Sequence, residues 1–217
     1  MGNNFITDSK IKKVLVLAPH TDDGEFGCGG TIARLIKEGV EVHYVAFSAC
    51  EQSVLPQFPS DILITEVVEA TNVLGIKKDK LHLLKYDVRT FNYNRQAILD
   101  DIIIFRNKIN PDLVFIPSVN DIHQDHSTIA NEAIRAFKFC NILCYEMPWN
   151  NFNFATTSFM LLSEEHINIK IEALKKYKSQ EHRSYANEEF IRSLASVRGV
   201  QVGQRYAEVF EVIRLIH

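Results

Sequence analysis

The sequence has few of the features that mark a secreted, metal-finger or redox protein. It contains only four cysteines in 217 residues, and none of them form a Cys-x-x-Cys pair. Neither a disulfide framework nor a structural zinc site built from thiolates is therefore expected. We interpret all four as small packed thiols: Cys28, Cys50, Cys140 and Cys144.

Long apolar runs and an excess of basic charge are also missing. No stretch approaches the roughly 20 apolar residues that cross a bilayer, so no membrane span is expected. A net charge of −3 provides no basic surface for a nucleic-acid backbone, and we expect no nucleic-acid partner. Residues 1–13 lack the apolar core of a secretion signal, which predicts a cytoplasmic protein.

The glycines do not form a nucleotide-binding motif. Gly27, Gly29 and Gly30 do not have the Gly-x-Gly-x-x-Gly spacing, and no Walker-type phosphate loop is present. We interpret this cluster as relief of crowding where a strand turns into a helix. A dinucleotide cofactor is not supported.

The pattern that is present alternates strand-like and helix-like segments. This predicts an α/β protein with a mostly parallel sheet, formed as one domain over residues 1–217, with short antiparallel strands in a C-terminal elaboration that covers the site. The expected strands are 14–17, 42–47, 81–84, 113–116, 141–145, 159–162 and 209–215. The expected helices are 29–38, 61–74, 96–109, 127–139, 164–178 and 188–195.

Two polar clusters follow two of these apolar strands. The run 14–17 is followed by His20, Asp22 and Asp23, and the run 113–116 is followed by the cluster 121–126. Ligands bind at the carboxyl ends of strands in open α/β sheets. We therefore expect one metal site built from both clusters.

The residue types fit a hydrolytic metal ion, which takes three protein ligands and leaves a position for water. His20, one of the two aspartates and a histidine of the second cluster supply that set. Successive side chains diverge, so the other aspartate is free to act as general base. In the second cluster, one of His123 and His126 ligates while the other faces the substrate, with Asp125 as the natural partner that charges it.

The strings APHTDDGEFGCGGT at 18–31 and DIHQDH at 121–126 resemble the two motifs of the LmbE-like (PIG-L) metal-dependent de-N-acetylases. Weaker traces run on to Phe210, so the resemblance covers nearly the whole chain. It implies a Rossmann-like, three-layer α/β/α fold and removal of an acyl group, most often acetyl, from an amino sugar or its conjugate. It also implies self-association into a homo-oligomer, which no sequence patch shows.

The resemblance also implies a role for each site residue. Zinc is held by His20, Asp23 and His126, although Fe(II) or another divalent metal fits the same ligands. Asp22 is the general base, His123 polarises the carbonyl or stabilises the oxyanion, and Asp125 orients and charges His123. The expected reaction is attack of a metal-bound water on the amide.

The chain departs from the family pattern where substrate contacts are expected. Residues 48–51 replace a glycine-containing turn, and Leu63 stands where many members have arginine. Glu25 has no assigned role, because Gly24 separates it from the aspartate pair. The substrate of better-known members therefore cannot be assumed. We also expect Trp149 to lie either at the active-site edge, where it would stack on a sugar ring, or in the core.

Two other functions use the same residues. His20, Asp22 and His126 also fit the two-histidine, one-carboxylate triad of Fe(II) oxygenases, although those triads usually lie on β-rich folds. A non-catalytic sugar- or metal-binding protein is the second alternative. The presence of Asp22 and His123 speaks against it, because binding alone needs neither a base nor an oxyanion partner.

Overall fold

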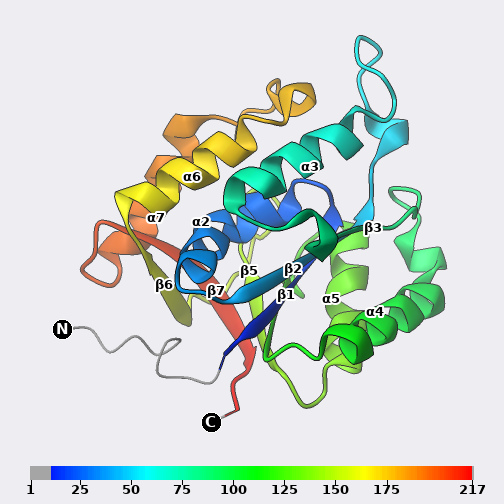
Figure 1. Cartoon of the computed structure of the whole chain (residues 1–217). Coiled ribbons are helices and arrows are strands. Elements are labelled where there is room, and N and C mark those ends of the chain that lie inside the picture. Colours follow the sequence, from blue (N-terminus) through cyan, green and yellow to red (C-terminus); the bar gives the residue numbers. More distant parts are fainter. Residues whose placement is uncertain (1–10, 217) are drawn as a thin grey trace.

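A computed structural model describes residues 11–216, which form one seven-stranded sheet with helices on both faces (Figure 1). The strand order is β3-β2-β1-β4-β5-β7-β6. The strands are β1 (Lys13–His20), β2 (Glu41–Ser48), β3 (Leu81–Leu83), β4 (Leu113–Pro117), β5 (Asn141–Tyr145), β6 (Ser158–Leu162) and β7 (Tyr206–Arg214). Residues 1–10, which carry most of the segment expected to lack a secretion signal, lie outside the described part of the chain.

The first five strands are parallel, and the last two are antiparallel to their neighbours. Strand β1 lies between β2 and β4, and its residues 14–18 are fully buried. A strand covered on both faces needs a continuous apolar run, which is what this segment has. The predicted α/β class, the mostly parallel sheet and the short antiparallel strands near the C-terminus are confirmed.

Two helical layers bury the two faces of the sheet (Figure 1). One face carries α2 (Asp23–Lys37), α3 (Ile62–Leu74), α6 (Glu164–Leu174) and α7 (Glu188–Val200). The other carries α4 (Arg95–Ile109) and α5 (Gln124–Ala136). Alternate residues of β1 separate accordingly: Val14 and Val16 pack in the first core, and Leu15 and Leu17 in the second. Short 3-10 helices lie in the connections between these elements, at residues 51–53, 78–80, 91–93 and 178–180.

Helices α2 and α5 begin earlier than the sequence predicts. Helix α2 begins at Asp23 rather than at Gly29, and it bends at Cys28, whose φ of −146° is not helical. Glycine allows the early start: a Cβ at Gly24 would lie 2.4 Å from the ring of Tyr44. Helix α5 begins at Gln124 rather than at residue 127, so part of the second polar cluster lies in its first turn.

The bend in α2 is held by a buried ion pair between Lys170 of α6 and Glu208 of β7. The Lys170 ammonium donates to the carbonyl oxygen of Phe26 before the bend, at 2.6 Å. The Glu208 carboxylate accepts the backbone N–H groups of Gly30 and Thr31 after it, at 3.0 and 2.7 Å. The pair therefore satisfies backbone groups that the interrupted helix leaves without partners.

None of the helices within residues 11–216 is long and apolar enough to span a bilayer. The four cysteines are free; three are buried and Cys140 is partly buried, as expected for packed thiols.

Candidate metal centre

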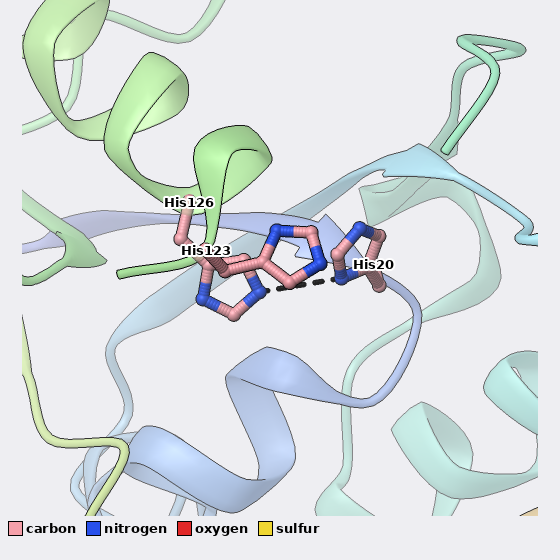
Figure 2. A group of neighbouring side chains, drawn as sticks. All are labelled: His20, His123 and His126. Atoms are coloured by element: carbon pink, nitrogen blue, oxygen red, sulfur yellow. Dashed lines mark hydrogen bonds between the residues drawn. The ribbon is translucent and has the colours of Figure 1, made fainter. Parts of the chain in front are cut away.

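The two polar clusters meet at the carboxyl ends of β1 and β4 (Figure 2). His20 is the last residue of β1, and Asp23 begins α2 after a two-residue turn. His123 precedes α5, and His126 lies in its first turn. Adjacent parallel strands β1 and β4 continue to helices on opposite faces of the sheet, and such a switch point is where α/β proteins bind ligands.

Three acceptor atoms form a nearly equilateral triangle. Nδ1 of His20 lies 3.2 Å from Oδ2 of Asp23, which lies 3.2 Å from Nε2 of His126. The two ring nitrogens are 3.3 Å apart (Figure 2). Corners of a tetrahedron around a zinc ion with bonds of about 2.05 Å are about 3.3 Å apart. The triangle therefore has the size that one such ion requires.

Two further carboxylates fix which nitrogen of each ring faces this triangle. Oδ2 of Asp121 lies 2.8 Å from Nδ1 of His126, and Oδ2 of Asp125 lies 3.0 Å from Nε2 of His20. Each carboxylate binds the protonated nitrogen of its ring, so the other nitrogen presents a lone pair to the centre. A carboxylate that accepts the second ring N–H of a histidine in this way is the usual support of a histidine that binds a metal.

The expected pairing of Asp125 with His123 is wrong. Asp125 lies in the first turn of α5, and its carboxylate turns toward β1 and the loop before α4. There it accepts from His20 and from the backbone N–H of Arg89, at 2.6 Å. Only the backbone N–H of Asp125 contacts the His123 ring, at Nδ1 and 3.2 Å.

His123 stands beside the triangle rather than in it. Its ring centroid is 4.9 Å from that of His20 and 4.7 Å from that of His126, so the three imidazoles together could also hold a metal ion. However, Nδ1 accepts a backbone N–H, which leaves the ring proton on Nε2. Burial and the charges of the other two histidines lower the pKa of His123 to about 4. His123 is therefore a neutral donor, not the charged one expected from pairing with Asp125.

The centre favours positive charge. Burial lowers the pKa of His126, but the charge of Asp23 and the bond to Asp121 outweigh it and raise this pKa to about 10. Burial opposes ionisation of Asp23 as well, and His126 and His20 still hold its pKa well below the usual range. A buried group of two imidazoles and three carboxylates with these preferences suits a cation.

Asp22 faces the same space but is not part of the triangle. It is half-buried and immediately precedes α2. Burial and the adjacent charge of Asp23 raise the pKa of Asp22 to about 6, with His20 and Arg183 acting in the opposite direction. A carboxylate with a pKa close to neutrality can both take up and release a proton under ordinary conditions.

A cavity of about 390 Å³ opens over the centre. Besides the site residues, it is lined by Phe26, Cys50, Ser53, Leu63, Val88, Arg89, Trp149, Asn150, Gln180, Arg183 and Tyr185. Two positions where the chain departs from the family pattern, Cys50 and Leu63, thus face the ligand space. Trp149 forms part of the wall, and its ring is stacked on Tyr185 with centroids 3.8 Å apart, so one of its faces is already covered.

Two buried acids of this region have no role that the sequence pattern predicts. Asp121 belongs to the second motif, and its position five residues before His126 is the only sequence signal for its contact with that ring. Glu25 is completely buried, and its carboxyl group contacts the hydroxyls of Tyr44 and Tyr177. Because both tyrosines come from distant segments, the sequence around Glu25 could not reveal these contacts.

Comparison with known proteins identifies the family. The family model for GlcNAc-PI de-N-acetylase (PIG-L) matches residues 15–137, more than half of the chain. The chain is 31% identical to the uncharacterized deacetylase YaiS of Escherichia coli K12, over 79% of this chain and 93% of that one. It is 25% identical to the diacetylchitobiose deacetylase of Thermococcus kodakarensis, over 91% and 82% of the two chains.

A solved structure gives the same result. The N,N'-diacetylchitobiose deacetylase from Pyrococcus horikoshii superposes with a TM-score of 0.81 at 25% identity, covering 96% of this chain and 86% of that one. The protein belongs to the PIG-L (LmbE-like) family of de-N-acetylases, as its motifs suggested.

Proposed function

We propose that the protein is a zinc-dependent hydrolase that removes an N-acyl group, acetyl in the first instance, from an amino sugar or its conjugate. The observation that carries this proposal is the triangle of acceptor atoms from His20, Asp23 and His126. Two nitrogen lone pairs and a carboxylate oxygen within 3.3 Å of one another repel unless a proton or a cation lies between them. Family membership and a cavity of a size that fits a small sugar support the same reading.

The donor set fits zinc. Two imidazoles and one carboxylate leave a fourth position open, which is typical of catalytic rather than structural zinc sites. Fe(II) and other divalent metals accept the same ligands, and elemental analysis of the purified protein distinguishes them. When bound, the metal supplies a Lewis acid that lowers the pKa of water toward about 7 and polarises the amide carbonyl.

The protein's own groups then manage the protons. Asp22 accepts a proton from the attacking water, for which its pKa of about 6 is suitable. The Nε2–H of His123 donates a hydrogen bond to the oxyanion that develops on the carbonyl oxygen. When the C–N bond breaks, Asp22 returns the proton it took from the water to the leaving amine, and the products are a carboxylate and a free amino sugar.

Replacing Asp22 by asparagine tests this division of roles. The Asp22→Asn protein is expected to bind metal as the wild type does but to lose about a hundredfold to ten-thousandfold in turnover, the contribution typical of a general base. Metal content is measured by elemental analysis, and amine release is measured on N-acetylglucosamine and N,N'-diacetylchitobiose. His20→Ala, the matched control, is expected to lose the metal itself. An Asp22→Asn protein with full metal content and wild-type rates would contradict the assignment.

A further inference from the structure

Two arginines line the cavity without forming an ion pair with any carboxylate in residues 11–216. These are Arg89, after β3, and Arg183, between α6 and α7. Most other arginines of residues 11–216 pair with a carboxylate, as in the partly buried bidentate contact of Arg198 with Glu146, whereas Arg106 and Arg214 donate to backbone carbonyl oxygens. A guanidinium always carries its charge and presents planar donors that match a carboxylate or a phosphate. Two of them at the wall of one ligand space leave positive charge there that forms no ion pair, although Arg183 acts electrostatically on Asp22.

The Arg183 side chain is held in place by neutral groups. Its Nε donates to Oε1 of Gln180 at 2.7 Å, and its guanidinium carbon lies 5.9 Å from the centre of the Tyr185 ring. Gln180 is buried, and its amide donates to Oγ of Ser179 at 3.0 Å. Together with a hydrogen bond to the Tyr185 side chain, these contacts hold the exposed guanidinium at the wall of the cavity without neutralising it.

The Arg89 side chain is also held by a neutral group, and the backbone at this residue is strained. Its φ is +68°, a left-handed conformation that favours glycine and is costly for a long side chain. The backbone N–H is fixed on Asp125, and one terminal nitrogen donates to Oγ of Ser53 at 2.8 Å. Glycine would keep the backbone bond to Asp125 and relieve the strain. Arginine at this position therefore points to a use for its side chain.

We propose that Arg89 and Arg183 bind an anionic group, a phosphate or a carboxylate, on the aglycone of the amino-sugar substrate. The inference rests on the proposed function, because the metal centre at the bottom of the same cavity must receive the N-acyl group. It narrows the substrate class to acidic conjugates. Neutral chitin fragments such as diacetylchitobiose would then be poorer substrates of this chain.

The competing explanation is that Arg183 acts only on Asp22. Its charge is one of the influences on that carboxylate. In that case replacing Arg183 would slow all substrates by the same factor and would shift the pH profile of kcat. An anion-binding role instead changes the ratio of kcat/KM between charged and neutral substrates.

The test uses three glycosides of N-acetylglucosamine that differ only at the anomeric substituent: the ethyl glycoside, the carboxymethyl glycoside and the 1-phosphate. Amine release by the metal-loaded protein is measured for each over a range of salt concentrations. We expect kcat/KM to be at least tenfold higher for one charged glycoside than for the ethyl glycoside, and this preference to fall as salt rises. The carboxymethyl and phosphate arms tell which anion is bound.

Three variants complete the design. Arg183→Gln and Arg89→Gly are each expected to reduce the charged-to-neutral ratio of kcat/KM by about ten- to a hundredfold, the size of a charge-assisted hydrogen bond. The thermal midpoint of Arg89→Gly is expected to equal or exceed that of the wild type, which separates lost binding from lost folding. Arg106→Gln is the matched control: this arginine lies on α4, away from the cavity, and donates to the carbonyl oxygen of Ala136. Its ratio and its kcat are expected to stay unchanged.

The outcomes are separable. No amine from any glycoside overturns the proposed function and with it the anion site. Equal kcat/KM for the ethyl and the charged glycosides overturns the anion site while the deacetylase function stands. An equal loss on all three substrates in Arg183→Gln, with a displaced pH profile, assigns that arginine to Asp22 instead and also overturns the proposal.

Discussion

At the scale of single residues, the carboxylates behind the imidazoles decide what each histidine can do. Asp125 holds His20 and Asp121 holds His126, each at the nitrogen that faces away from the centre. His123 has no such carboxylate; a backbone N–H takes its Nδ1. His20 and His126 thus present lone pairs to the centre, and His123 presents an N–H. The sequence alone does not distinguish these three histidines.

This assignment gives Asp125 a role in metal binding. Asp125→Asn removes the charge that supports His20, and metal affinity is expected to fall about tenfold to a hundredfold. The measurement is a competition titration with a chromophoric chelator. Asp101→Asn serves as control, because Asp101 bonds to Tyr86 outside the centre. Unchanged affinity together with reduced turnover would return Asp125 to the partnership with His123 that the sequence suggested.

Glu25 is a buried acid that the chemistry above does not use. The hydroxyls of Tyr44 and Tyr177 both contact its carboxyl group and both lie within 2.9 Å of the carbonyl oxygen of Thr21. Two hydroxyl protons serve only two of these four contacts, and a proton on Glu25 serves a third. Burial raises the pKa of Glu25 to about 8, in agreement with a protonated group.

A pH dependence of stability follows. The unfolded chain ionises Glu25 near pH 4.5, whereas the folded chain does so near pH 8. The folded state therefore binds more protons between these values, and the free energy of unfolding falls as pH rises through this window. The wild type is expected to lose stability relative to Glu25→Gln by up to about 1.4 kcal/mol per pH unit. Urea unfolding at pH 5, 6, 7 and 8 measures the difference; two parallel curves would show that Glu25 is ionised when folded.

At the scale of elements, helix α2 connects the metal centre to the C-terminal part of the chain. Its first turn carries Asp23, and its bend rests on Lys170 and Glu208 from α6 and β7. Strand β7 thus supports the site through the interior, and no residue of β6 or β7 lines the cavity over the metal centre. This support could not be anticipated from the local sequence of α2.

Removing half of the buried pair is expected to be costly. Glu208→Gln leaves the Lys170 ammonium buried without its counter-charge, and the free energy of unfolding should fall by about 3 kcal/mol. The double variant Lys170→Met with Glu208→Gln should lose less than the sum of the two single losses, because no unpaired charge remains. Urea unfolding of the four proteins gives the coupling. Strict additivity would mean that the two side chains support α2 independently.

At the scale of the whole molecule, the fold class and the position of most helices and strands were predictable, whereas the side-chain partnerships were not. Strand Asn141–Tyr145 was predicted to the residue because an apolar run bounded by polar residues fixes both ends. The starts of α2 and α5 lie earlier than predicted, because the glycines and charged residues of their first turns are also typical of loops. The α/β sheet and the family leave the oxygenase alternative without support.

In the site, too, the sequence predicts which segments come together but not the partner of each side chain. Strand ends at β1 and β4 predict that the two polar clusters meet, and the family resemblance selects His20, Asp23 and His126 among their residues. The structure brings these three together. The partner of Asp125 and the arginines of the cavity depend on side-chain directions and on loops far apart in the chain. Periodicity and motif spacing carry no information on either.

The measurement that tests the central claim most directly is anomalous scattering from crystals grown with zinc. We expect one strong peak at about 2.0 to 2.1 Å from Nδ1 of His20, Nε2 of His126 and a carboxylate oxygen of Asp23, with Nε2 of His123 outside bonding distance. A peak bonded to His123 in place of Asp23, or none within reach of these three residues, would contradict the account.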